Sequence, residues 1–67
     1  MVNFNKLRGL MTERNVSQNE LARRLGCSRQ TVNNKMNGKN PFTLRDVTEI
    51  CDAINATPDE RNAIFFE

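Results

Sequence analysis

Four segments of this chain begin with the same helix-start signal, a serine or threonine where a helix takes its cap. Such a side chain accepts a hydrogen bond from a backbone N–H that the first turn otherwise leaves unpaired. The caps are Ser17, Ser28, Thr43 and Thr57, and all but Ser28 are followed three residues later by an acid, the pattern of a capping box. No segment shows the alternation of a strand, so the sequence predicts an all-α fold.

Glycine, asparagine and proline mark where the helices end. Gly26 and Asn37-Gly38 tolerate positive φ just beyond a helix end, and Pro41 keeps a helix from running through residues 38–42. We therefore expect five helices around one small core. Their predicted spans are residues 3–14, 18–25, 29–36, 44–54 and 58–66.

Apolar residues at helical spacing define the candidate core. Adjacent Phe65 and Phe66 cannot both face it from one helix, because neighbouring side chains point about 100° apart. Cys27 and Cys51 are expected as small buried apolar residues. The first and fourth helices are expected to contribute Phe4, Leu7, Leu10 and Met11, and Leu44, Val47, Ile50, Cys51 and Ile54.

The chain lacks the residue types that most enzymes and metal sites need. It has no histidine, and its two cysteines are spaced unlike any zinc-binding unit. Nucleophilic arrangements that use histidine are therefore excluded, and we expect no catalytic residue, metal, cofactor or small-molecule ligand. No apolar run resembles a membrane span or a secretory leader. We expect a cytoplasmic protein with reduced thiols and no membrane partner.

Charge is divided unevenly along the chain, although the net charge is only +2. Residues 1–39 carry eight Lys or Arg against two Glu, a balance of +6, whereas residues 40–67 carry two Arg against six acids, a balance of −4. A domain divided in this way has a positive side that suits a polyanion. The alternative is that basic and acidic helices alternate and are merely solvated.

The second and third helices are joined so closely that they must cross steeply. Leu25 ends one, Gly26 turns, and Ser28 caps the next, while Ala22 supplies the small side chain that such a crossing needs. This arrangement predicts a helix-turn-helix, whose second helix enters the major groove of DNA.

The third helix carries a polar arc suited to reading bases. Its members, within about 140° of the helix circumference, are Arg29, Gln30, Asn33, Asn34 and Asn37. Arginine matches guanine in the major groove, and glutamine or asparagine matches adenine. Because asparagine is a poor helix former, three of them in one arc favour a function over a plain solvated face.

The chain resembles the Xre/Cro family, the lambda-repressor-like DNA-binding domains, over about residues 4–66. Pro41-Phe42-Thr43-Leu44 and Ile64-Phe65-Phe66 are similar to small phage-type repressors of that family. The chain departs from the family at Lys35, where a large apolar residue is usual, which suggests a rotated or shortened end of that helix. The matching helix-turn-helix positions are Ser17-Gln18-Asn19-Glu20-Leu21-Ala22, Leu25-Gly26-Cys27-Ser28, Thr31-Val32 and Asn37-Gly38-Lys39.

The resemblance implies roles for individual residues. The first residue of the family's second helix grips a phosphate, which implies that role for Gln18. Lys39 and Asn40, in the loop after the recognition helix, and Asn34 on the polar arc are further candidate phosphate contacts. Early residues of the family's recognition helix read bases, a role that carries over to Ser28, Arg29, Gln30 and Asn33.

These observations together predict a single helix-turn-helix DNA-binding domain over residues 1–67. We expect a repressor that binds a palindromic double-stranded DNA operator as a homodimer, with Ile64, Phe65 and Phe66 as the candidate dimer interface. One alternative is a protein-interaction module of the same fold, such as an antirepressor. Another is nonspecific nucleic-acid binding through charge alone.

Overall fold

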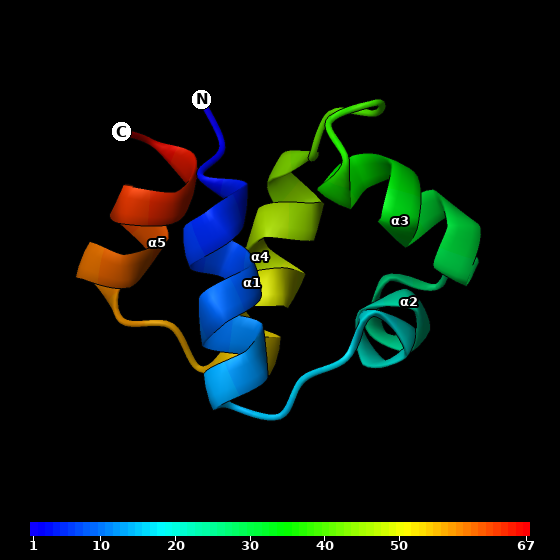
Figure 1. Ribbon diagram of the computed structural model, residues 1–67, viewed down its shortest axis with the longest axis horizontal. Coiled ribbons are helices and arrows are strands. Elements are labelled where there is room, and N and C mark those ends of the chain that lie inside the picture. Colours follow the sequence, from blue (N-terminus) through cyan, green and yellow to red (C-terminus); the bar gives the residue numbers. More distant parts are fainter.

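The computed structural model describes residues 1–67, which form five α-helices and no strand (Figure 1). The predicted all-α fold is confirmed, and the helix bounds differ from the predicted ones by one residue at each end of the first helix and at the end of the fifth. The helices are α1 (Phe4–Glu13), α2 (Gln18–Leu25), α3 (Arg29–Met36), α4 (Leu44–Ile54) and α5 (Pro58–Phe65).

The helices form two groups on either side of α4. α1 packs against α5 on one side, while α2 packs against both α3 and α4 on the other (Figure 1). The chain termini lie close together beside α1 and α5. A hydrogen bond from the Asn3 N–H to the Ile64 carbonyl oxygen, 2.7 Å long, ties the two ends together. None of the helices combines the length and the hydropathy needed to span a membrane.

Each of the four predicted caps accepts a hydrogen bond from the backbone N–H three residues later. The reciprocal bond of a capping box is present at Thr43, from Asp46, and at Thr57, from Glu60. It is missing at Ser17, because the Glu20 carboxylate pairs instead with arginines one turn along α2. The Ser17 capping box is therefore only half formed.

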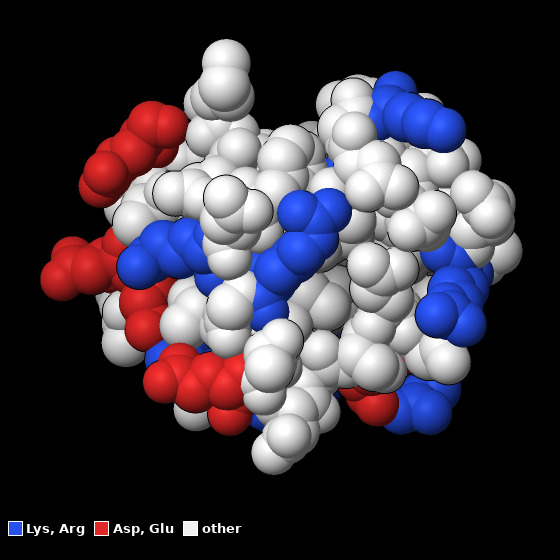
Figure 2. Space-filling model, viewed as in Figure 1, with Lys and Arg blue, Asp and Glu red and all other residues white.

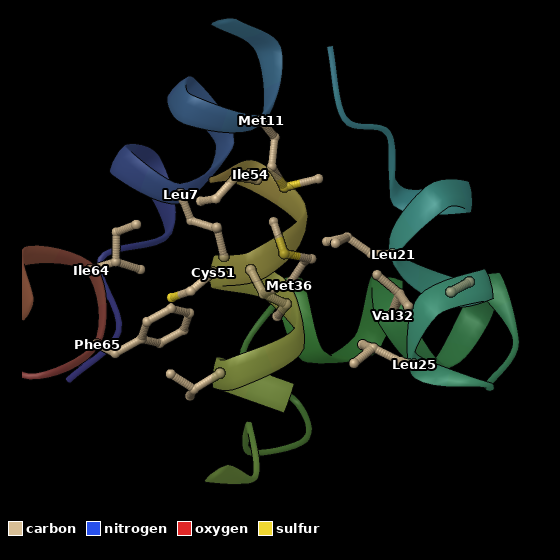
Figure 3. Close-up of a cluster of buried hydrophobic side chains, with 13 residues drawn as sticks. Leu7, Met11, Leu21, Leu25, Val32, Met36, Cys51, Ile54, Ile64 and Phe65 are labelled. Atoms are coloured by element: carbon tan, nitrogen blue, oxygen red, sulfur yellow. The ribbon is translucent and has the colours of Figure 1, made fainter. Parts of the chain in front are cut away.

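All five helices contribute to the core (Figure 3). Met36, at the end of α3, is fully buried and lies near the middle of the cluster. α3 ends at Met36, as its predicted span does, so the shortened end that Lys35 suggested is not present. The buried apolar residues are Leu7, Met11, Leu21, Ala22, Leu25, Val32, Met36, Val47, Ile50, Cys51, Ile54, Ile64 and Phe65.

Leu44 is a correction to the predicted core, because its side chain is 77% exposed. As the first residue of α4 it lies at the edge of the apolar arc, about 70° from the centre of that arc. The Leu44 side chain is left uncovered, whereas those of Asp46 and Val47, two and three residues later, are buried. Phe4 and Phe42 are half-buried at the core's margin, their ring centroids 6.3 Å apart.

The two terminal phenylalanines point apart, as predicted. Phe65 is 8% exposed and its ring meets that of Phe42 edge-on, with centroids 5.6 Å apart, whereas Phe66 is 60% exposed. Cys51 is buried and Cys27 is half-buried, and both thiols are free. Burial raises the pKa of the Cys51 thiol, which suits a residue that acts as a small apolar side chain.

Candidate nucleic-acid interface

The turn between α2 and α3 depends on Gly26 in the left-handed conformation, with φ of 68°. Its N–H bonds to the Arg23 carbonyl oxygen and the Cys27 N–H bonds to that of Ala22, at 3.3 and 3.0 Å, which closes the end of α2. Ser28 then caps α3 immediately. The two helices therefore cross within a very short length of chain, and buried apolar side chains from both hold the crossing.

The N-terminal ends of α2 and α3 border a hollow of about 380 Å³ that is lined only by polar residues. No apolar residue lines it. The fold thus brings together, from two helices, one of the predicted phosphate contacts and three of the four predicted base readers. The lining residues are Gln18, Arg29, Gln30 and Asn33.

The remaining predicted residues of α3 lie beside this hollow. The Gln30 Nε2 donates to Asn34 Oδ1 over 3.0 Å, so the two side chains, one turn apart, orient each other. Ser28 Oγ accepts the Thr31 N–H at 3.1 Å and lies 2.9 Å from the Thr31 hydroxyl oxygen. The Ser28 hydroxyl therefore caps α3, and Ser28 is nevertheless exposed to solvent.

Some of the arginines and lysines near this face form salt bridges with acids of the same chain, and others do not. On α2, Arg23 and Arg24 pair with Glu20, and Arg24 also reaches Asp52 on α4 at 3.1 Å. Arg29 on α3 and Lys39 in the next loop take part in none of the salt bridges and are exposed. Their charge is therefore available to an outside anion.

Figure 2 shows how the charged side chains are distributed on one face of the molecule. Lys and Arg side chains border the α2–α3 side of the molecule, while most Asp and Glu side chains gather over α5 and the adjoining end of α1, where further Lys and Arg side chains also lie. In this view the α2–α3 side is therefore mainly basic, as expected, whereas the opposite side carries both charges.

The loop after α3 exposes Lys39 and Asn40. Gly38 turns the chain with φ of 79°, and the Lys39 N–H donates to the Asn34 carbonyl oxygen over 2.9 Å. Sequence reasoning missed Arg8 of α1, whose Nη2 donates to the Met36 carbonyl oxygen at 2.8 Å. No local signal could have found this contact, because 28 positions separate the two residues.

Sequence reasoning also missed an ion pair beneath this loop. Lys35 Nζ lies 2.5 Å from Oδ2 of Asp46, the one buried charged residue of the chain. Burial opposes ionisation of this carboxyl, but hydrogen bonds from Lys35 and Thr43 outweigh it and lower the pKa of Asp46. Asp46 was assigned only a capping role from the sequence.

The three candidate dimer residues have different surroundings. Ile64 and Phe65 are buried in the chain's own core, and Phe66 is exposed. Phe66 shares two adjoining hollows with Leu44 and Val47. One of these, of about 340 Å³, is mostly apolar and is completed by Val2, Pro41, Phe42, Thr43 and Phe65.

Two crossed helices, a left-handed glycine between them and a polar outer face on the second define a helix-turn-helix. Residues 5–64 match a family model described as a helix-turn-helix domain, and the chain belongs to that family. Its fold and family place it among DNA-binding regulators. A comparison with curated proteins found no match.

Proposed function

We propose that this protein is a sequence-specific repressor of the Xre/Cro type, which binds a palindromic double-stranded operator as a homodimer. The observation that carries the proposal is the polar hollow between Gln18 at the start of α2 and Arg29, Gln30 and Asn33 on α3. Phosphate contacts fix the register of such a domain, and base contacts read the sequence. In this proposal one hollow supplies both kinds of contact.

Base reading is assigned to the first two turns of α3. Arg29 has the five donors and the free charge to bind guanine O6 and N7 together, and Gln30 and Asn33 carry amides that match adenine N6 and N7. The Gln30–Asn34 hydrogen bond supports this role, because it restricts the orientation of the Gln30 amide before DNA arrives. Ser28 is the fourth proposed base contact, at the exposed start of the helix.

Phosphate binding is assigned to both ends of the same face. Gln18 is the first residue of α2, where unpaired backbone N–H groups and the helix dipole favour an anion. Lys39 and Asn40 are exposed in the loop after α3, and Asn34 lies between that loop and the hollow. Together they would follow the DNA backbone along the length of the recognition helix.

The homodimer follows from the size of the domain. Its Cα atoms extend over 28 × 23 × 19 Å, whereas successive half-sites on one face of the duplex lie about 34 Å apart. One copy therefore covers one half-site. We assign the contact between copies to exposed Phe66 and its neighbour Leu44, with Ile64 and Phe65 holding Phe66 in place from inside the core. Occupancy of the operator is then sufficient for repression.

Selection of binding sites from random duplexes, followed by sequencing, tests this function. The expected result is a palindrome whose half-sites are about ten base pairs apart, bound at roughly nanomolar strength in physiological salt. Lys6→Ala, which removes an exposed positive charge from α1, is the control and should select the same sequence. Recovery of no preferred sequence would contradict the proposal and favour a protein partner or charge-only binding.

A further inference from the structure

The last turn of α3 and the first turn of α4 are joined through a single carboxylate oxygen. Asp46 Oδ2 accepts a hydrogen bond from Lys35 Nζ at 2.5 Å and another from the Thr43 N–H at 2.9 Å. The Thr43 hydroxyl oxygen in turn accepts the Asp46 N–H at 3.0 Å. The last turn of the recognition helix and the cap of the next helix thus share one polar centre.

This centre is buried at the base of an exposed loop. The side chains of Lys35 and Asp46 are 15% and 6% exposed, while every residue from Asn37 to Pro41 is exposed. The loop spans residues 37–43, and both of its ends are attached to the Lys35–Asp46 pair. The pair therefore fixes the separation of the loop's two ends.

Two other contacts hold the loop's first half. The Arg8 side chain donates to the Met36 carbonyl oxygen at 2.8 Å and to Asn37 Oδ1 at 3.3 Å. The Phe4 ring lies against Gly38, 3.8 Å from where a Cβ would be. The Lys39 N–H is also held, by the Asn34 carbonyl oxygen, so what is left free at the tip is the side chains of Lys39 and Asn40, the proposed contacts to the DNA backbone.

A buried ion pair adds little net stability to a fold. The desolvation of two charges offsets most of their attraction, and replacing such a pair by uncharged residues of similar size is often neutral or stabilising. What the pair supplies is a defined geometry, because both charges need their partner in one position. The geometry that this pair defines is that of the loop after the recognition helix.

We infer that the Lys35–Asp46 pair positions the loop that carries Lys39 and Asn40 against the DNA backbone, which makes Lys35 a positioning residue for operator binding. The inference rests on the proposed function. Lys35 itself touches no DNA in this account, since its charge is directed inward to Asp46. It acts by holding Lys39 where a phosphate will lie, so that less freedom is lost on binding.

The test is a double variant, Lys35→Met with Asp46→Asn, which leaves the net charge of the chain unchanged. Methionine keeps the length of the apolar stem, and the asparagine oxygen still accepts the Thr43 N–H. We expect the variant to fold, to lose about tenfold in operator affinity, and to show a salt dependence shallower by about one unit per lost Lys39 contact. Adding Lys39→Ala should then weaken binding by less than it does in the wild type, because the two changes remove one contact.

Two controls separate positioning from general stability. Lys35→Arg retains the ion pair and is expected to retain operator affinity within about threefold. The charge-neutral pair Arg14→Gln with Glu60→Gln removes another interhelical ion pair, one that ties α1 to α5, and should leave the salt dependence of binding unchanged. If the double variant does not fold, Lys35→Met alone preserves the capping carboxylate and takes its place.

Amide NMR of the free protein distinguishes this inference from the proposed function. In the double variant without DNA, the Lys39 and Asn40 signals should show more motion than they do in the wild type without DNA. Unchanged loop signals, or losses from Lys39→Ala that are the same in both backgrounds, would overturn the positioning role while wild-type protein still binds its operator. A wild type that selects no operator would instead overturn the proposed function.

Discussion

Arg14 and Glu60 form a bidentate ion pair between the end of α1 and the first turn of α5. The bonds from Nη1 to Oε1 and from Nη2 to Oε2 are both 2.8 Å long. The Arg14 Nη1 also donates to the Ile54 carbonyl oxygen at 3.2 Å, and Glu60 Oε1 accepts the Thr57 N–H at 2.9 Å. One arginine therefore joins the ends of α1 and α4 to the capping box of α5.

This pair predicts how stability depends on acid. The hydrogen bonds from Arg14 and from the Thr57 N–H lower the pKa of Glu60 from 4.5 to about 2. A carboxyl whose pKa is lower in the folded state stabilises that state above its unfolded pKa, and the contribution is lost as pH falls towards the folded pKa. We expect the thermal midpoint of the wild type to fall between about pH 4.5 and 2, and to fall less in Glu60→Gln.

Circular dichroism melts over this pH range provide the measurement. Because the pKa of Asp46 is also lowered, both proteins lose some stability from this residue as pH falls. Only the difference between their two curves therefore reports on Glu60. Parallel curves for the wild type and Glu60→Gln would show that the ion pair contributes nothing to acid stability.

The second prediction concerns base reading by Arg29. Arg29→Ala should cost about 1–3 kcal/mol on the preferred operator and relax the preference at one position in each half-site. Its place in the hollow with Gln30 and Asn33 gives the physical reason. Titrations of operators mutated one base pair at a time would measure the effect, with Lys6→Ala as the control. Equal weakening on every sequence would make Arg29 a phosphate contact instead.

The third prediction concerns Lys39 and salt. If its free ammonium binds a phosphate, Lys39→Ala should make the log–log dependence of operator affinity on salt shallower by about one unit per contact. The matched control is Lys6→Ala, which removes an exposed lysine from the start of α1 and should leave this dependence unchanged. An unchanged dependence in Lys39→Ala would remove the loop from the interface.

The fold could be predicted because each helix carries its own local signals. Thr57-Pro58 with Glu60 specifies a helix start within one turn, and Gly26 specifies an end, whatever the rest of the chain does. Gln18 and Arg29 line one hollow because α2 and α3 cross steeply, and the short turn at Gly26 predicts that crossing. Local chemistry was sufficient at these positions.

The contacts that sequence analysis predicted wrongly or missed are ones that no local sequence signal encodes. The Leu44 side chain is exposed because no other segment covers it. The spacing of apolar residues along α4 cannot predict whether another segment will lie there. The Lys35–Asp46 and Arg8–Met36 contacts join residues on different helices. Glu20 illustrates a competition, because two arginines on its own helix displace the capping bond that its spacing predicted. Each outcome depends on the tertiary arrangement.

The last prediction concerns the surface that pairs two copies of the chain. Phe66 and Leu44 are its exposed large apolar residues, 60% and 77% exposed, and they line the same two hollows. Exposed apolar area of this kind on a small domain is typical of a contact site. The neighbouring Phe65 provides the matched control, because it is the same residue type packed inward against Phe42.

Phe66→Ser and Leu44→Ser should therefore weaken self-association and affinity for the full palindrome while leaving the thermal midpoint and half-site affinity close to those of the wild type. Phe65→Ala should instead destabilise the fold by about 3–5 kcal/mol, because it empties a packed core position. Analytical ultracentrifugation with and without operator DNA, alongside thermal melts, separates the two effects. The dimer surface is assigned wrongly if both serine variants keep wild-type association, or if the wild type binds a full palindrome no more tightly than a half-site.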